Sequence, residues 1–396
     1  MTRLVVVGAS LAGLRAVESA RRAGFTGAIT LLGAEEHLPY DRPPLSKEFL
    51  TGDGTPKQFR TEDALRTDLD VDLRLGTPAT GLDPEQRVIH AGDDVVPYTA
   101  AVLATGATAR TLPWLPTLSG LHTLRTLDDA RTLRTVIHPG VRVVIVGAGF
   151  IGSELACSAR RMGAEVTLVE AAPVPFAAAV GEELAPTIAA LHTRNGTDLR
   201  CDVTVTGIDG DDRVRAVRLG DGSTLSADVV IVGVGAAPAT GWLVGSGLKL
   251  DDGVVCDETL ATSASDVYAA GDVARWFNPL FGETMRLEHW TSAAEQGGLA
   301  ARNAIDPGAA TPCTLVPYFW SDLYGGRVQF VGVPTADEVR VVAGDPAEDT
   351  LLALYRRGDR LIGALGVEQR RPVLRMRALI GKRVSWEGAL AEVAAG

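Results

Sequence analysis

The sequence predicts an α/β fold in which two parallel sheets each start with a strand, a glycine-rich turn and a helix. Two stretches carry this prediction: VVVGASLAGLRAVESARRAG near the N-terminus and VVIVGAGFIGSELACSARRMG from residue 143. In each stretch an apolar strand runs into glycines, and apolar positions then recur at helical spacing. A strand followed directly by such a turn and helix is typical of βαβ units, whose strands are parallel.

The glycines of each turn have separate expected roles. Gly8 allows the tight turn, and Gly13 lets the helix pack against the strand. The middle residue, Ser10, lets the backbone approach a pyrophosphate, which then meets the N–H groups at the positive end of the helix. Serine is small enough to leave that backbone accessible. The corresponding residues of the second copy are Gly147, Gly149 and Gly152.

An acidic residue should follow each turn by about 20 residues, where its carboxylate accepts hydrogen bonds from ribose hydroxyls. The strand AITLLGAEE ends at Glu35 and Glu36, and the strand AEVTLVEAAP reaches Glu170. Each copy thus has the turn, the helix and the acid. This combination favours the interpretation as two dinucleotide-binding sites over the alternative of two buried turns that bind no ligand. Because Glu170 is followed by two alanines and no arginine that would receive an extra phosphate, we expect NADH there, not NADPH.

Two dinucleotide units in one chain indicate a flavin dinucleotide that stays bound and a nicotinamide that exchanges. The strand AAVLATG, ending in Thr105 and Gly106, returns the chain to the first unit. The parallel phrase ADVVIVGVGAAP, with Gly233 and Gly235, closes the second unit. We therefore interpret the segment between the two phrases as an inserted βαβ unit. Asp272 ends another apolar strand and is a candidate partner of a ribityl hydroxyl, with an ordinary helix N-cap as the alternative.

Composition excludes several classes of protein. The 396 residues are 46% hydrophobic and 22% charged, which is typical of a globular chain, and the net charge of -11 argues against general nucleic-acid binding. No apolar stretch is long enough to span a bilayer, and Gly8 interrupts the N-terminal apolar run too early for a signal peptide. We therefore expect no membrane association and a cytoplasmic location.

Neither metal nor thiol chemistry is expected. The six histidines form no metal-binding motif, and the cysteines have neither metal-ligand nor redox-pair spacing. We interpret the cysteines as small core residues, so that organic cofactors must carry any redox chemistry. The four cysteines are Cys157, Cys201, Cys256 and Cys313.

Six phrases together resemble one family over essentially the whole chain. They are PYDRPPLSKEFL, LATGATARTLP, VGAGFIGSELA, VYAAGDVARW, RLEHWTSAAEQG and PYFWSD. Their order and separations are similar to those of the FAD-dependent, NADH-using ferredoxin and rubredoxin reductases, which serve bacterial haem monooxygenases and ring-hydroxylating dioxygenases. PYDRPPLSK is the most specific phrase, because many flavoproteins share the glycine turns.

The resemblance implies two Rossmann-like domains and a third domain. A discontinuous FAD domain would comprise residues 1–109 and 236–314, with an inserted NAD domain at 110–235 and a C-terminal α+β domain at 315–396. The first glycine turn would then hold FAD and the second NADH. GRVQFVG and LIGALGVEQ are expected to be strands of the C-terminal domain.

The resemblance also assigns residues to the flavin. Arg42 and Lys47 would lie beside it, and Lys47 would pair with Glu154, which we predict in the first turn of its helix, where a carboxylate favours the helix dipole. An ammonium group there stabilises negative charge on reduced flavin. For Glu154 the alternative is a simple helix-end charge. Arg125 would contact FAD, and Trp290 would start a flavin-side helix, with a core aromatic as its alternative.

The predicted catalytic pair is Lys47 and Glu154, and no metal site is predicted. The predicted cofactor-binding residues are Gly8, Ser10, Ala12, Gly13, Glu35, Arg42, Lys47, Ala79, Thr105, Gly106, Arg125, Asp272, Trp290, Gly147, Gly149, Ile151, Gly152, Glu170, Gly233 and Gly235. Phe319 and Trp320 are expected to serve packing or a domain interface.

The implied partner is a small iron–sulfur ferredoxin or a rubredoxin, and the sequence leaves the oligomeric state open. A C-terminal run of basic residues, with only Asp359 and Glu368 opposing it, would steer an acidic partner; a solvated surface is the alternative. Two other functions stay open: a slow NADH-binding flavoprotein sensor of the apoptosis-inducing-factor type, and a disulfide or peroxide reductase. The basic residues are Arg356, Arg357, Arg360, Arg370, Arg371, Arg375, Arg377, Lys382 and Arg383.

Overall fold

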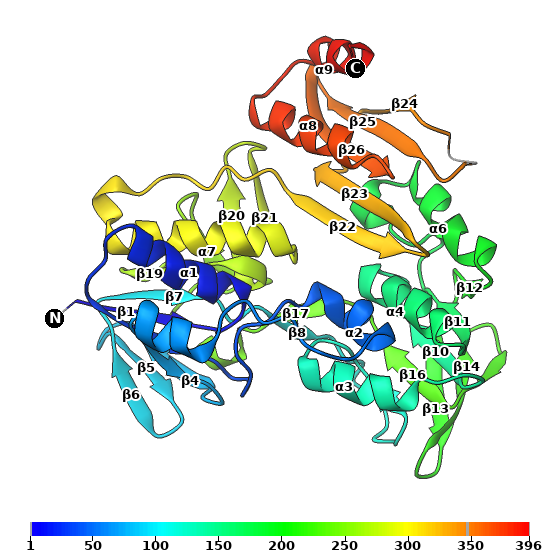
Figure 1. The fold of residues 1–396 in the computed structure, drawn as a ribbon, viewed down its shortest axis with the longest axis horizontal. Coiled ribbons are helices and arrows are strands. Elements are labelled where there is room, and N and C mark those ends of the chain that lie inside the picture. Colours follow the sequence, from blue (N-terminus) through cyan, green and yellow to red (C-terminus); the bar gives the residue numbers. More distant parts are fainter. Residues whose placement is uncertain (1, 346–347, 396) are drawn as a thin grey trace. The chain divides into compact units, whose positions relative to one another are not determined.

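The structure, a computed structural model, describes residues 2–345 and 348–395 of the chain (Figure 1). It contains two compact units. Unit 1 consists of Met1–Asp41, Lys57–Thr108 and Ala237–Pro317, and unit 2 consists of Arg42–Pro56, Ala109–Ala236 and Tyr318–Gly396. The segment Arg42–Pro56 thus groups with unit 2, whereas we assign it to the FAD domain from the sequence. The boundaries of the three predicted domains stay a prediction.

Unit 1 is built on a five-stranded parallel sheet with the strand order β19-β7-β1-β2-β3. Its central strands are apolar runs that are almost wholly buried, as is typical of parallel sheets covered on their faces. The strands are β1 (Arg3–Val7), β2 (Ala28–Leu32), β3 (Val71–Arg74), β7 (Ala100–Leu103) and β19 (Val267–Ala269).

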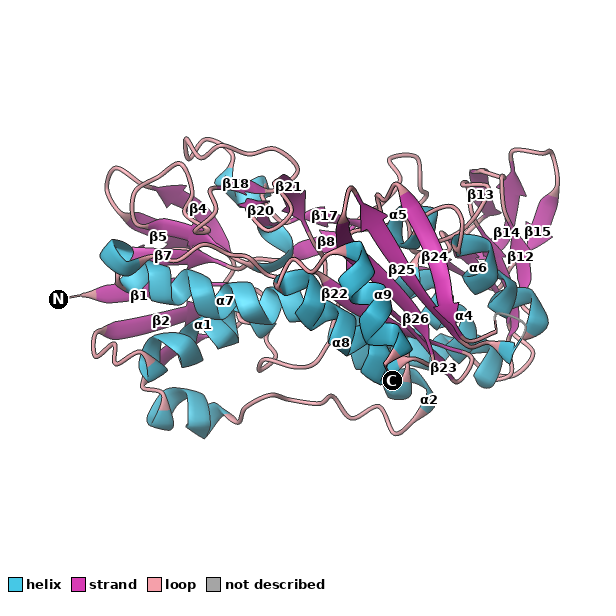
Figure 2. Cartoon of the chain, turned by 90° about the horizontal axis from the view of Figure 1, so that it is seen from above, coloured by secondary structure: helices cyan, strands magenta, loops and turns pink. Residues whose placement is uncertain are grey.

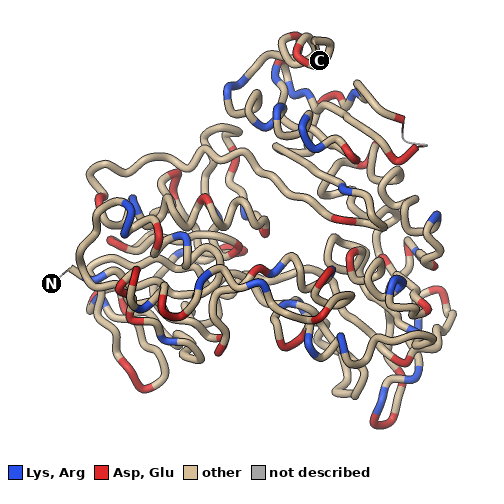
Figure 3. The backbone as a smooth tube through the Cα atoms, in the orientation of Figure 1, with Lys and Arg blue, Asp and Glu red and all other residues tan. Residues whose placement is uncertain are grey.

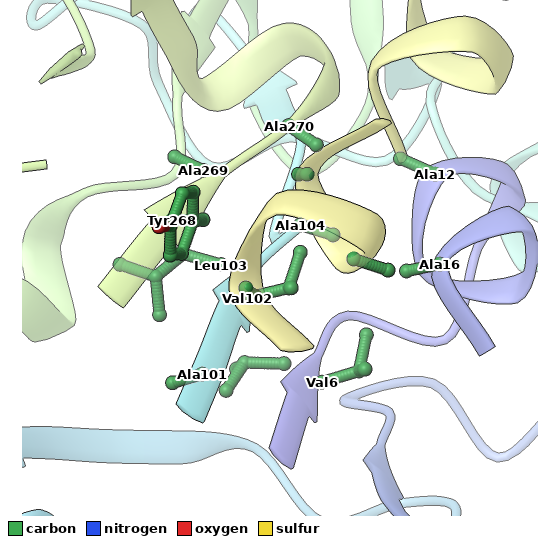
Figure 4. Close-up of a cluster of buried hydrophobic side chains, with 14 of the residues drawn as sticks. Val6, Ala12, Ala16, Ala101, Val102, Leu103, Ala104, Tyr268, Ala269 and Ala270 are labelled. Atoms are coloured by element: carbon green, nitrogen blue, oxygen red, sulfur yellow. The ribbon is translucent and has the colours of Figure 1, made fainter. Parts of the chain in front are cut away.

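Helices α1 (Leu11–Arg22) and α7 (Trp290–Ile305) lie side by side on this sheet (Figure 2). Figure 4 shows the small apolar side chains between them and the strands, among them Val6 and Ala16. The two helices approach closely because residue 297 is glycine: a Cβ at Gly297 would lie 2.1 Å from the carbonyl oxygen of Ala12. This packing holds the start of α1 in place beside the first glycine turn.

One buried carboxylate lies on α1. Glu18 is 5% exposed, and its carboxylate accepts hydrogen bonds from Arg15 Nη1 over 2.6 Å and from Arg60 Nε over 2.8 Å. Burial opposes ionisation of Glu18, but the hydrogen bonds and positive charges of the two arginines outweigh it and lower the pKa below the ordinary value of 4.5. The ionised Glu18 therefore stabilises the folded state.

We predict that this contribution disappears in acid. A group whose pKa is depressed by folding adds stability above its unfolded pKa and loses it as the pH falls through the folded value. Glu18→Gln should lower the free energy of unfolding by about 2 kcal/mol at pH 7, and the difference from the unmodified chain should shrink below about pH 4.5. Urea unfolding at a series of pH values measures this. A difference that stays constant down to pH 3 would contradict the assignment.

The other elements of unit 1 are two small sheets and short helical turns. The first sheet is an antiparallel meander of β4, β5 and β6, and the second joins β18, β20 and β21. Their bounds are β4 (Ala79–Asp83), β5 (Val88–Ala91), β6 (Asp94–Pro97), β18 (Val254–Cys256), β20 (Ala274–Asn278), β21 (Glu283–Arg286), η2 (Ala64–Asp68), η3 (Gly241–Leu243), η4 (Gly271–Val273) and η5 (Pro307–Ala309).

Unit 2 contains a second five-stranded parallel sheet, with the order β12-β11-β10-β16-β9. Helix α4 packs on its central strands, and a hairpin sheet of β13, β14 and β15 follows β12. The bounds are β9 (Leu121–His122), β10 (Arg142–Val146), β11 (Glu165–Val169), β12 (Asp198–Arg200), β13 (Val205–Gly210), β14 (Val214–Leu219), β15 (Thr224–Ser226), β16 (Val229–Val232), η1 (Pro43–Ser46), α2 (Glu48–Thr51), α3 (Leu127–Val136), α4 (Phe150–Arg161), α5 (Ala177–Val180) and α6 (Ala185–Arg194).

The C-terminal part of unit 2 is a five-stranded antiparallel sheet, β22-β23-β26-β25-β24, with α8 packed on β23 and β26. GRVQFVG forms β23, and LIGALGV of LIGALGVEQ lies in β26, which confirms both predicted strands except for Glu368 and Gln369, which follow the end of β26. The bounds are β22 (Tyr318–Leu323), β23 (Gly326–Gly332), β24 (Glu338–Ala343), β25 (Leu351–Arg357), β26 (Arg360–Val367), α8 (Arg370–Gly381) and α9 (Trp386–Ala394).

Two parallel sheets, each entered through a glycine turn, together with an α+β C-terminal part confirm the predicted α/β fold. The two remaining strands, β8 (Ala107–Ala109) and β17 (Ala236–Pro238), pair with each other. Within residues 2–345 and 348–395, every helix is too short or too polar to cross a membrane.

Candidate cofactor sites

The first glycine turn closes tightly onto the neighbouring strands. Gly8 follows β1 with a φ of +116°, which favours glycine, and its N–H donates to the carbonyl oxygen of Leu32 over 2.7 Å. A Cβ at Gly8 would lie 2.1 Å from the carbonyl oxygen of Ala104, and a Cβ at Gly13 would lie 1.8 Å from that of Gly8. Neither position therefore accepts a side chain without movement of the backbone.

The second turn repeats this geometry in unit 2. Gly147 has a φ of +99°, and a Cβ there would lie 2.4 Å from the carbonyl oxygen of Gly233. A Cβ at Gly152 would lie 2.0 Å from the carbonyl oxygen of Gly147. The duplication seen in the sequence is thus a duplication of backbone packing.

The middle residues of the two turns differ in type but not in backbone region. Ser10 has φ −105° and ψ −160°, and Gly149 has φ −68° and ψ −176°, both of which any residue adopts. Helices α1 and α4 begin directly afterwards, and neither start carries a side-chain cap hydrogen bond. Since the first N–H groups of a helix have no partner within it, both starts fit a pyrophosphate.

The two acids lie where the pattern predicts, after β2 and β11. Glu35 accepts a hydrogen bond from the hydroxyl of Tyr40 over 2.6 Å. Glu170 accepts hydrogen bonds from the backbone N–H groups of Ala148 over 2.8 Å and Ala172 over 2.9 Å. The Glu170 carboxylate is therefore tied to the second glycine turn itself.

The loops after β7 and β16 lie beside the glycine turns. Thr105 Oγ1 donates to the carbonyl oxygen of Ala239 over 3.0 Å, and Gly106 follows with a φ of +69°. In unit 2, the N–H of Gly233 donates to the carbonyl oxygen of Val146, and Gly235 has a φ of +98°. The predicted residues thus lie in loops at the carboxyl ends of strands, where α/β sheets bind ligands.

Asp272 and Trp290 lie in unit 1. Asp272 is inside the short helix η4, whose N-cap is Ala270, so the N-cap alternative for Asp272 is wrong. Trp290 is the first residue of α7, and its indole Nε1 donates to Asp41 Oδ1 over 2.8 Å. The ring is only partly buried and packs against the edge of the core. A core aromatic is therefore an incomplete description of Trp290.

Unit 2 brings Lys47 and Glu154 together across 107 residues of sequence. Lys47 Nζ lies 2.7 Å from Glu154 Oε2, and the carboxylate is 5% exposed. Two hydroxyls complete its shell: Ser46 Oγ donates to Oε2 over 2.5 Å, and Ser321 Oγ donates to Oε1 over 2.7 Å. Lys47 Nζ also donates to the carbonyl oxygen of Pro43 over 3.1 Å. The result is an ion pair between a half-buried ammonium group and a buried carboxylate that is hydrogen-bonded at both oxygens.

One detail of the prediction for Glu154 is wrong. Helix α4 begins at Phe150 after Gly149 and carries no acid in its first turn, so Glu154 lies one turn further along. Its charge is balanced by Lys47 and by the hydroxyls of Ser46 and Ser321, in place of the helix dipole, which falls off within the first turn. Sequence reasoning missed both serines, because only their place in PLSK and WSD was available as a signal.

The two predicted arginines also meet in unit 2. Arg42 Nη1 donates to the carbonyl oxygen of Arg125 over 2.8 Å, and Arg125 directly precedes the cap of α3 at Thr126. Three other predicted cofactor-binding residues lie on other elements. Ala12 is buried on α1, Ala79 is the first residue of β4, and Ile151 is 40% exposed in the first turn of α4.

All four thiols have raised pKa values. Cys256 and Cys313 are buried, as predicted, whereas Cys157 and Cys201 are only half-buried. Burial raises the pKa of Cys157 to about 11 and of Cys256 and Cys313 to about 12, and it also raises that of Cys201. Over the described part of the chain, no cluster of His, Cys, Asp and Glu forms a potential metal site.

Comparison with known proteins agrees with this geometry. The family model described as "Pyridine nucleotide-disulphide oxidoreductase" matches residues 2–297, and the model described as "Reductase C-terminal" matches residues 318–394. The chain is 35% identical to the ferredoxin–NAD(+) reductase component of the anthranilate 1,2-dioxygenase system of Burkholderia cepacia, over 95% of this chain and 93% of the relative. It is 35% identical to the rubredoxin–NAD(+) reductase of Pseudomonas putida, over 91% and 94%.

A solved structure shows the same fold. The covalent putidaredoxin reductase–putidaredoxin complex superposes with a TM-score of 0.91 at 30% identity and covers 100% of this chain and 98% of the other. Two glycine turns of one geometry, a paired lysine and glutamate, and these matches lead to one assignment. The chain belongs to the pyridine nucleotide-disulphide oxidoreductases and, within them, to the ferredoxin and rubredoxin reductases with a reductase C-terminal domain.

Proposed function

We propose that the chain carries electrons from NADH through FAD to a small iron–sulfur protein, a ferredoxin or a rubredoxin, that feeds an oxygenase in the cytoplasm. The observation that carries this proposal is the repeated glycine turn, closed in the same way at Gly13 and Gly152. The names of the related reductases supply the acceptor. No side-chain nucleophile is needed.

Residues of both turns would hold the two nucleotides. The start of α1 and Glu35 fit the pyrophosphate and ribose of FAD, and the start of α4 with Glu170 fits those of NADH. When bound, FAD accepts a hydride and releases electrons one at a time, which joins a two-electron donor to a one-electron acceptor. The chain's own contribution is to bind and orient both molecules, since correct orientation alone supplies much of the rate.

Lys47 supplies a fixed positive charge in this scheme. Its ammonium group is held between Glu154 Oε2 and the carbonyl oxygen of Pro43. A fixed cation beside a ring that gains negative charge stabilises the reduced form without reorganisation of the protein. Glu154 keeps the ammonium group in place, which is a positioning role.

The disulfide or peroxide reductase is disfavoured by the thiols. Such chemistry needs a thiolate, and a thiol with its pKa raised to about 11 or 12 is almost entirely protonated at neutral pH. All four cysteines are free, and burial raises the pKa of every one of them. The raised pKa values therefore favour the cofactors, and not the thiols, as the carriers of redox chemistry.

Steady-state turnover separates the reductase from the slow sensor. With NADH as donor and a [2Fe–2S] ferredoxin as acceptor, a reductase should reach about 10 turnovers per second, the typical enzyme range. Cytochrome c reduction by the ferredoxin reports the rate. A rate near zero, with NADH binding tightly and persistently, would support the sensor and contradict the proposal.

The C-terminal basic cluster is a proposed docking surface for an acidic partner. Figure 3 shows Lys and Arg gathered in this part of unit 2. The sequence indicates Asp359 and Glu368 as the acids near the cluster, and the structure adds two more. Glu338 forms an ion pair with Arg356, and Glu392 forms one with Arg375. Arg370 and Arg371, exposed at the start of α8, stay available to a partner's carboxylates.

Charge reversal at Arg370 and Arg371 should slow electron transfer to an acidic ferredoxin about tenfold at low salt and leave ferricyanide reduction unchanged. Unfolding is no explanation for such a loss, since glutamates in the first turn of α8 favour its dipole. Arg213→Glu with Arg215→Glu, in the exposed β13–β14 hairpin, changes the net charge equally and serves as the control. Equal ferredoxin rates in both double variants would exclude docking at α8.

A further inference from the structure

The carboxylate of Glu154, on α4, receives donors from two other segments of unit 2. Lys47 and Ser46, from the segment Arg42–Pro56, contact Oε2, and Ser321, from β22, contacts Oε1. Ser46 is 4% exposed and Ser321 is fully buried. Because water is excluded, each hydroxyl is a charge-assisted donor that solvent does not replace.

Ser321 is held in place independently of its bond to Glu154. It pairs with Val328 in the β22–β23 ladder, and the turn of this hairpin places Tyr324 against α6. The Tyr324 hydroxyl lies 2.8 Å from His192 Nδ1, and His192 Nε2 lies 3.0 Å from Ser153 Oγ, the neighbour of Glu154 on α4. The hairpin is therefore also linked to α4 through His192 of α6, and loss of the Ser321 hydroxyl should act locally.

We propose that Ser321 is a positioning residue. Through its hydrogen bond to Glu154, it would tune the electrostatic potential that Lys47 and Glu154 together produce at FAD. The inference rests on the proposed function, in which Lys47 lies beside the flavin. By occupying Oε1, the Ser321 hydroxyl fixes the carboxylate with Oε2 toward Lys47. Ser46 donates to the other oxygen, Oε2, which also faces Lys47.

The direction of the effect follows from electrostatics. The positive end of each hydroxyl dipole points at Glu154 and offsets part of its negative charge. Without the Ser321 hydroxyl, the buried carboxylate keeps its full charge and cancels more of the Lys47 charge. The local potential becomes more negative, which disfavours reduced flavin, since it carries additional negative charge. Ser321→Ala should thus lower the flavin midpoint potential.

The test is the midpoint potential of bound FAD, measured by equilibration with redox dyes. Ser321→Ala and Ser46→Ala should each change the ratio of reduced to oxidised flavin about tenfold, which is about 30 mV for a two-electron couple. Thr30→Val, equally buried but with its hydroxyl bonded to Asp72 in unit 1, is the control and should keep the unmodified potential. Thermal unfolding of FAD-free protein should also show a lower melting temperature for Ser321→Ala.

Several outcomes would overturn the inference. If Ser321→Ala and Ser46→Ala keep the flavin midpoint potential of the unmodified protein while NADH still reduces the flavin in both variants, the inference fails and the proposed function stands. An equal shift in Thr30→Val would make the effect a general result of removing a buried hydroxyl and would also overturn the inference. An unmodified protein that binds no FAD would overturn the proposed function itself, and the inference with it.

Discussion

A single methyl group added at Gly152 is expected to slow reduction by NADH about 100-fold while FAD stays bound. The new Cβ would lie 2.0 Å from the carbonyl oxygen of Gly147, so the turn or the start of α4 must move by about 1 Å. A displacement of that size at a binding site costs about 100-fold in rate. Stopped-flow bleaching of the flavin by NADH measures the loss in Gly152→Ala.

The matched change at Gly13 should instead impair the binding of FAD. A Cβ there would lie 1.8 Å from the carbonyl oxygen of Gly8, so Gly13→Ala should be purified without bound FAD. Gly149→Ser is the control, because it copies Ser10 at a position where a Cβ meets no atom within 4 Å. Unimpaired reduction of Gly152→Ala by NADH, or FAD retained by Gly13→Ala, would contradict the assignment of the turns.

Glu170→Ala is expected to remove the preference for NADH over NADPH. The change deletes a carboxylate that is held by the N–H groups of Ala148 and Ala172 and that fits the ribose hydroxyls. Loss of charged hydrogen bonds should lower kcat/KM for NADH by 10-fold to 100-fold, or about 1.5–3 kcal/mol. Removal of its repulsion should leave NADPH use unchanged or improved. Steady-state kinetics with both nucleotides give the ratio.

Glu165→Ala provides the comparison for that measurement. Glu165 is an exposed acid at the other end of the same strand, β11, so it carries the same charge away from the glycine turn. This variant should keep the preference of the unmodified chain. An unchanged preference in Glu170→Ala would show that another feature selects the nucleotide.

Local patterns in the sequence predict the glycine turns because their geometry depends on adjacent residues. The positive φ of Gly8 and the close contact at Gly13 both arise within one strand, turn and helix. The acid after β11 is predictable for the same reason, since a parallel neighbour ends beside the turn. The sequence therefore reveals the two sites whose parts are near each other in the chain.

Contacts between distant segments could not be predicted in this way. Ser321 and Glu154 are 167 residues apart, and no local pattern indicates that a serine of β22 reaches α4. The place of Glu154 within α4 depends on where that helix begins, at Phe150, which the run of small residues before it leaves ambiguous. The acids that pair with the C-terminal arginines likewise come from β24 and α9.

The most direct test of the central claim is an anaerobic titration of the purified protein, followed by the visible flavin spectrum. The account predicts a yellow protein whose absorbance bleaches with stoichiometric NADH and responds weakly to NADPH. That result would support both cofactor assignments together. A colourless protein that cannot be reconstituted with FAD would contradict the assignment of the first glycine turn, and with it the proposed route of electrons.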